Sequence, residues 1–373
     1  MNAGAQAGAW SPALTPGVIA GPPIWNGASM TAEIAIARQP RTWNAGLLEL
    51  LVIEAIDGDR SLQDIRDQVS SRTGRPVETR VVGEVVGKLV AAGLVVNPYA
   101  PPSAKEPTGQ DTRASDGREA TEDGLLSRIA GAVWRLGPHL QLRLITGAIA
   151  LGAGATAAWF VFSAGDFMTA VAGIRGGRLA DGVIALVLTL AWQLAVIFGH
   201  ELAHGLAFAA VSDRKPVLSV AKIGRRALPN TKLDGFWLLK STRQRLAVVL
   251  VGPLTSIMSC AVPLAVLANS THGSLAADWA AMAISLEVAM AFLNLVPMRY
   301  SDGTRLWEAW AAVRNLPGLG VARVLGRVRP PEALPVRSRL AISAYLPASI
   351  IGSLLLTACL VVWLIVLVRG GAA

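Results

Sequence analysis

The sequence predicts a mainly α-helical membrane protein, in which a polytopic bundle of about five transmembrane helices follows a small soluble α+β domain. Of the 373 residues, 53% are hydrophobic and 16% are charged, whereas soluble domains carry about a quarter charged residues. The apolar residues gather in runs of roughly 20 or more, which is long enough to cross a bilayer as a helix. Only the first hundred or so residues show the short periodic segments of a soluble domain.

Residues 1–30 are rich in Ala, Gly and Pro, show no period, and are predicted to be irregular. Residues 31–98 form the small domain, in which 31–37 alternates as a short strand does. Helical periods follow at about 44–56, 61–73 and 78–92. Ser61 and Asp64 have the spacing of a capping box at the start of the second helix. Three short helices with flanking strands predict a winged-helix-like unit.

Residues 99–127 are mainly Pro, Ser, Thr, Asp and Glu, a composition that cannot bury a core and predicts a flexible linker. Residues 128–373 form the membrane domain. Its apolar runs predict spans at about 142–165, 182–211, 246–268, 276–297 and 340–368.

The basic residues predict how these spans are oriented. Twenty Lys and Arg residues lie just before the first predicted span, in the connection between the second and third spans, and in the connection between the fourth and fifth spans. Only three lie in the segments on the opposite side of the membrane. The positive-inside rule therefore places the N-terminal domain and both long connections in the cytoplasm, in a multi-pass protein of the cell membrane.

The net charge of +9 does not indicate nucleic-acid binding, because the basic residues lie between apolar runs. Residues 31–98 contain nine acidic and eight basic residues, a net charge of about −1. DNA-binding modules need a basic surface to contact the phosphates. We therefore expect no nucleic-acid partner. The lipid bilayer is an expected partner, and the sequence leaves the oligomeric state open.

The segment from His200 to His204 carries the chemical signal. Histidines four residues apart lie on one face of a helix, where both imidazoles can bind one Zn²⁺. Glu201 lies beside them and can act as a general base toward the attacking water. Ionisable residues are costly in mid-membrane, so three of them within five positions indicate a functional site.

A catalytic zinc needs a third protein ligand. The predicted fourth span ends in a segment that contains Asn294, Pro297, Asp302 and Gly303, and Asp302 can complete a two-His, one-Asp site if that segment bends back. In the predicted orientation, the histidines and Asp302 both lie toward the cytoplasmic ends of their spans. The sequence thus brings the two motifs to the same depth.

With these motifs, residues 180–310 resemble the site-2 protease family of intramembrane zinc metalloproteases. The family's zinc helix matches His200–His204, its Asn-x-x-Pro-x-x-x-x-Asp-Gly motif matches Asn294–Gly303, and Gly252–Ser256 is similar to a third family segment. The resemblance implies that His200, His204 and Asp302 bind zinc and that Glu201 is the general base. It also implies that Asn294 lies near the metal and helps to hold the substrate or the developing oxyanion.

The N-terminal domain resembles the PqqD-like peptide-recognition domains, in its helix spacing and in the turn from Asp57 to Leu62. Such domains bind the leader peptides of ribosomally made, modified peptides by adding a strand to a sheet edge. An unrelated winged-helix interaction module is the alternative interpretation.

These features predict a zinc metalloendopeptidase that cleaves a peptide or membrane-associated substrate near the cytoplasmic face. The expected substrate is a precursor or leader peptide captured by residues 31–98. Two alternatives remain: regulated intramembrane proteolysis of a transmembrane regulator, and a non-catalytic membrane binding or export protein with the same fold.

Overall fold

The computed structural model describes residues 10–96 and 179–369, apart from residues 38, 40, 213, 215, 224, 225 and 272. The chain divides into two compact units. The first, here called the N-terminal unit, combines Met1–Glu122 with Asp234–Lys240; the second, the membrane unit, combines Asp123–Leu233 with Ser241–Ala373. The predicted linker at 99–127 and the predicted first span at 142–165 lie outside the described residues.

A four-stranded antiparallel sheet forms one layer of the N-terminal unit. The central strand β3 (Met30–Ile36) pairs along one edge with β1 (Val18–Ala20) and β2 (Ile24–Trp25), and along the other with β4 (Thr42–Gly46). The prediction that residues 1–30 are irregular is therefore wrong for β1 and β2. Strands of three and two residues are too short to show a period, and only their pairing with β3 reveals them.

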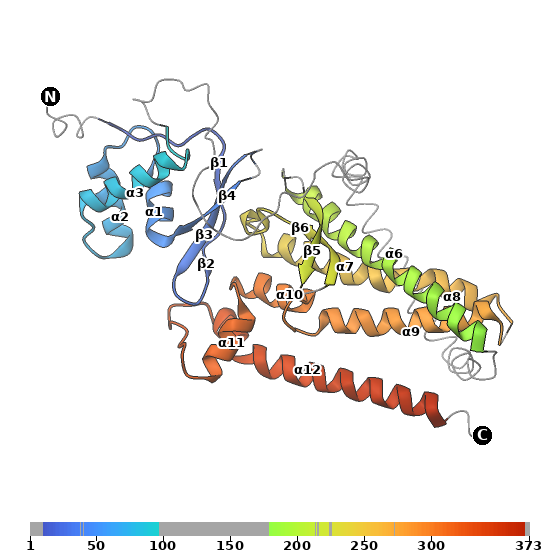
Figure 1. Cartoon of the computed structure of the whole chain (residues 1–373). Coiled ribbons are helices and arrows are strands. Elements are labelled where there is room, and N and C mark those ends of the chain that lie inside the picture. The colour runs from blue at the N-terminus through green and yellow to red at the C-terminus, as the bar shows by residue number, and fades with distance from the viewer. Residues whose placement is uncertain are drawn as a thin grey trace. The chain divides into compact units, whose positions relative to one another are not determined.

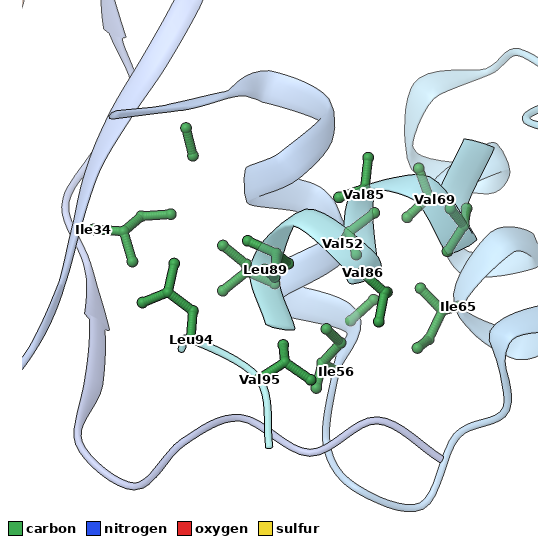
Figure 2. Close-up of a cluster of buried hydrophobic side chains, with 14 of the residues drawn as sticks. Ile34, Val52, Ile56, Ile65, Val69, Val85, Val86, Leu89, Leu94 and Val95 are labelled. Carbon is green, nitrogen blue, oxygen red and sulfur yellow. The ribbon is translucent and has the colours of Figure 1, made fainter. Parts of the chain in front are cut away.

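Three helices, α1 (Leu47–Ala55), α2 (Leu62–Thr73) and α3 (Thr79–Ala91), confirm the three predicted helical periods. Helix α1 packs on the sheet, and α2 and α3 pack on α1. The capping box is also confirmed, because Ser61 Oγ accepts from the Asp64 N–H and the Asp64 carboxylate accepts from the Ser61 N–H. Figure 2 shows how Ile34 from the sheet and Val52, Ile65 and Leu89 from the helices meet in one buried core.

Residues 234–240 fold as part of the N-terminal unit although they lie between two membrane helices in the sequence. They contain the short 3₁₀ helix η1 (Phe236–Leu238). The Trp237 N–H donates to the carboxylate of Glu33 on β3 at 3.1 Å. A Cβ at Gly21 would overlap the carbonyl of Trp237, so the close approach needs a glycine there.

Four helices of the membrane unit are long and apolar enough to cross a membrane: Ala180–Val211, Thr242–Ala268, Leu275–Leu295 and Val336–Ala358. They belong to α6 (Leu179–Val211), α7 with α8 (Thr242–Ser259 and Ala261–Ala268), α9 (Leu275–Leu295) and α12 (Val336–Arg369). In Figure 1 these helices run alongside one another, and α6, α7 and α9 pack together. They correspond to the last four predicted spans.

Three smaller features complete the membrane unit. The hairpin of β5 (Val217–Ile223) and β6 (Arg226–Lys232) follows α6 and packs against it. Helix α10 (Asp302–Ala311) follows α9 and contacts both α7 and α9, and α11 (Leu316–Val324) packs on α12. The hairpin therefore lies on α6, whereas α10 lies on α7 and α9.

Candidate metal centre

Three buried side chains from α6 and α10 converge on one point. Nε2 of His200 lies 3.1 Å from Nε2 of His204 and 2.9 Å from Oδ2 of Asp302. Nε2 of His204 lies 3.5 Å from the same Asp302 oxygen. His200 is 6% exposed, His204 3% and Asp302 8%. Among the described residues, these three form the group whose ligand atoms can hold a metal ion.

The triangle formed by the three ligand atoms fits a tetrahedral metal ion. With metal–ligand bonds of about 2.0–2.1 Å, two ligands of a tetrahedral zinc lie about 3.3 Å apart. The observed sides of 2.9, 3.1 and 3.5 Å bracket that length. Three protein ligands also leave a fourth position free for water or substrate, as a catalytic rather than a structural site requires.

The Nδ1 atom of each histidine is held by helix α7. His204 Nδ1 lies 2.7 Å from the carbonyl oxygen of Val248, and His200 Nδ1 lies 3.0 Å from Oγ of Ser256. Because a carbonyl oxygen only accepts, Nδ1 of His204 carries a proton, which leaves Nε2 as the ring atom that can bind a metal. The partners on α7 therefore turn Nε2 toward the metal position, which is the usual arrangement around metal-binding histidines.

Gly252 lets α7 come this close to α6. A Cβ at this position would overlap the imidazoles of both His200 and His204. Gly252 is itself buried, one turn beyond Val248 and one turn before Ser256. The segment Gly252–Ser256 thus has a physical role: its first residue makes room for the rings and its last binds one of them.

The turn between α9 and α10 brings Asp302 back to the histidines, as the sequence analysis expected. Helix α9 ends at Leu295, two residues before Pro297, whose ring disfavours a helical conformation of the residue before it. Ser301 then caps α10 by accepting from the Thr304 N–H. Gly303 packs against the end of α9, where a Cβ would overlap the carbonyl of Leu295. These contacts fix Asp302 as the first residue of α10.

Its surroundings favour the ionised form of Asp302. Burial opposes ionisation, but hydrogen bonds with His200 and His204 outweigh it and hold the pKa of the Asp302 carboxyl below its usual range. The N-terminus of α10 also presents the positive end of its helix dipole to this carboxylate. Asp302 is thus a carboxylate ready to bind a cation.

Glu201 lies next to His200 in α6, and strand β6 binds it. The Thr231 N–H donates to Oε2 of Glu201 at 2.7 Å, and the Thr231 hydroxyl donates to the backbone carbonyl of Glu201 at 2.7 Å. Thr231 is 3% exposed. Thr231 could not be predicted from the sequence, because a threonine thirty residues from Glu201 carries no signal until the hairpin folds against α6.

Asn294 lies half-buried in the last turn of α9. Within the part of the chain that the structure describes, no hydrogen bond joins it to His200, His204 or Asp302, so its proposed role near the metal stays a prediction. The role of the Val248 carbonyl could not be predicted from the sequence either, since any residue type offers that group.

Comparison of the chain with protein-family models, with curated proteins and with solved structures gave no match. The class of site is therefore defined by its own geometry: a buried two-histidine, one-aspartate group that can hold a metal ion. Its histidines lie on α6, which is apolar and long enough to cross a membrane, and its aspartate begins the short helix α10.

Proposed function

We propose that the chain is a membrane metallopeptidase of the site-2 protease kind, with Zn²⁺ held by His200, His204 and Asp302. The observation that carries this proposal is the convergence, within 3.5 Å of one another, of two Nε2 atoms from the apolar helix α6 and one carboxylate oxygen from the start of α10. A carboxylate, Glu201, follows the first histidine directly. Buried ionisable residues are rare in membrane helices and mark function where they occur.

Each residue has a distinct role in this proposal. His200, His204 and Asp302 orient the metal, and Ser256 and the Val248 carbonyl orient the two imidazoles. Bound zinc would polarise the scissile carbonyl and make water a stronger nucleophile near neutral pH. Glu201 accepts the proton of the attacking water and passes it to the leaving amine. Asn294 assists by binding the substrate or the oxyanion.

Metal analysis of the full chain purified in detergent tests the ligand set. Wild type and Glu201→Gln are expected to retain about one zinc per chain, because Glu201 is not a ligand. Asp302→Ala is expected to lose most of it, since two histidines alone make an incomplete site. Unchanged zinc in Asp302→Ala would show that the third ligand is wrong.

Comparative peptidomics of cells that carry wild type or Glu201→Gln tests the activity. Peptides that appear only with wild type identify the substrate and the cleavage site. If the purified wild-type protein binds zinc but neither purified protein nor cells yield wild-type-specific fragments, the non-catalytic alternative replaces this proposal.

We propose that the N-terminal unit supplies the substrate as a captured leader peptide. Strand β4 pairs with β3 on one edge, and no strand of the described residues pairs with its other edge. A strand at the edge of an antiparallel sheet can accept a peptide as an added strand. Capture on the same chain would raise the concentration of the peptide at the metal site.

Binding of a fluorescent leader peptide to full-length Glu201→Gln tests this capture, because that variant, which lacks the general base, is expected to cleave too slowly to disturb the binding measurement. The full chain is needed, since residues 234–240 belong to the N-terminal unit. Regulated proteolysis of a transmembrane regulator predicts no such binding. The basic connections favour cytoplasmic placement of this unit and of the active site.

A further inference from the structure

Strand β6 contacts Glu201 at both its side chain and its backbone. Through one residue, Thr231, the strand binds the carboxylate oxygen Oε2 and the carbonyl oxygen of Glu201, each at 2.7 Å. In the described part of the chain, Oε1 makes no hydrogen bond. The Thr231 contacts therefore fix the rotamer of Glu201 and leave one carboxylate oxygen available to accept a proton.

The pairing of the hairpin explains why this N–H is available. Thr231 lies opposite Leu218 of β5, and N–H groups in an antiparallel pair point alternately toward the partner strand and away from it. The Thr231 N–H points away, toward α6. By the same alternation, the backbone positions of Pro229 and Ala227 point to this outer edge, where a proline removes no hydrogen bond of the pair.

We infer that Thr231 is a positioning residue for the proposed general base, holding the Glu201 carboxylate in its working orientation through its backbone N–H. This inference rests on the proposed peptidase function. A hydrogen bond from N–H to an ionised carboxylate is among the stronger ones in proteins. The base would otherwise sample several rotamers, and misplacement of a catalytic group by about 1 Å can cost two orders of magnitude in rate.

Thr231→Pro tests the inference because it removes the N–H at a position where the strand pair does not use it. We expect kcat to fall about tenfold or more, with KM and zinc content within about twofold of wild type. Ala227→Pro is the matched control, since it places a proline on the same outer edge, four residues away, and should leave kcat unchanged. An unchanged or raised kcat in Thr231→Pro would overturn the inference.

Thr231→Val distinguishes the effect of the hydroxyl from that of the N–H. It removes the hydroxyl but keeps the backbone N–H and the shape of the side chain. We expect this variant to retain most of wild-type kcat, because the bond to the carboxylate remains. If Thr231→Pro fails to fold, the α-hydroxy analogue of threonine at position 231 replaces the N–H by an ester oxygen and keeps both side chain and backbone shape. The same fall in kcat is expected, and full activity of the ester would overturn the inference.

A double mutant distinguishes positioning from a general structural role. In a Glu201→Gln background, the working carboxylate is already absent, so Thr231→Pro should lower the residual rate no further. An additive loss would show that Thr231 acts elsewhere and would overturn the inference. Absence of cleavage by wild type itself, in contrast, would refute the proposed function and is recognised from the wild-type measurement alone.

Discussion

Ser256 holds the His200 imidazole through a 3.0 Å hydrogen bond between Oγ and Nδ1, across the interface of α7 and α6. Ser256→Ala removes the partner that orients the ring without touching the metal position. We expect metal affinity to fall by about 10–100-fold, the usual effect of losing such a partner. Titration of the metal-free protein with a competing zinc chelator measures this change.

Ser285→Ala is the control for that experiment. The Ser285 hydroxyl bonds to the Ala281 carbonyl within its own helix, α9, so its loss should leave zinc affinity at the wild-type value. Equal affinities of the two variants would contradict a role of Ser256 in the site.

Gly252 determines how closely α7 approaches the two histidines. We expect Gly252→Ala to reduce zinc content and cleavage by at least about tenfold, because the added methyl group would overlap both imidazoles and displace one of them. Gly182→Ala in α6 is the matched control, since a Cβ there meets nothing within 4 Å. Zinc analysis of both purified variants measures the effect. If Gly252→Ala bound as much zinc as wild type, the close packing of Gly252 on the two imidazoles would be refuted.

The capping box of α2 makes this helix sensitive to acid. Hydrogen bonds from the Ser61 hydroxyl and N–H lower the pKa of Asp64 from its ordinary value of 3.8. A group whose pKa is lower in the folded state stabilises it above the unfolded pKa, and this contribution disappears as the pH falls through the folded pKa. Protection of α2 amides should therefore decline as the pH drops below about 3.8.

Hydrogen exchange of the full chain between pH 2.5 and 6, corrected for intrinsic rates, measures this decline. Asp64→Asn should show a shallower pH dependence and weaker protection at pH 6. If wild type and Asp64→Asn showed the same pH dependence of exchange, the capping box would not contribute to the stability of α2.

Gly21 controls whether residues 234–240 can pack on the sheet. Gly21→Ala would bring a methyl group onto the Trp237 carbonyl, so we expect faster hydrogen exchange at residues 235–239. Gly83→Ala in α3 is the control, because its Cβ would meet nothing within 4 Å. Unchanged exchange at η1 in Gly21→Ala would contradict this packing.

The sequence predicted what depends on local periodicity and on residue type. The three helices of the N-terminal unit, the four long apolar helices, the capping box at Ser61 and the grouping of His200, His204 and Asp302 followed from spacing and residue type. Helices α10 and α11 lie in a stretch predicted only as a connection and were missed. The sequence did not predict β1 and β2, whose formation depends on pairing with β3. Nor did it predict Thr231 or the Val248 carbonyl, because long-range strand packing and backbone groups leave no pattern in the residue types.

The hydrogen bond between Glu33 and Trp237 has a consequence for biogenesis. Glu33 leaves the ribosome some two hundred residues before its partner, so the N-terminal unit is completed only after α6 has been synthesised. A folded unit cannot be divided by a bilayer, so both segments must end in the same compartment. Helix α6 as a single membrane crossing would separate them, so a second crossing is required between the two segments. If the helices between these segments failed to insert into the membrane correctly, the sheet would lack η1. The N-terminal unit would then stay incompletely folded, and cellular proteases can recognise such a state.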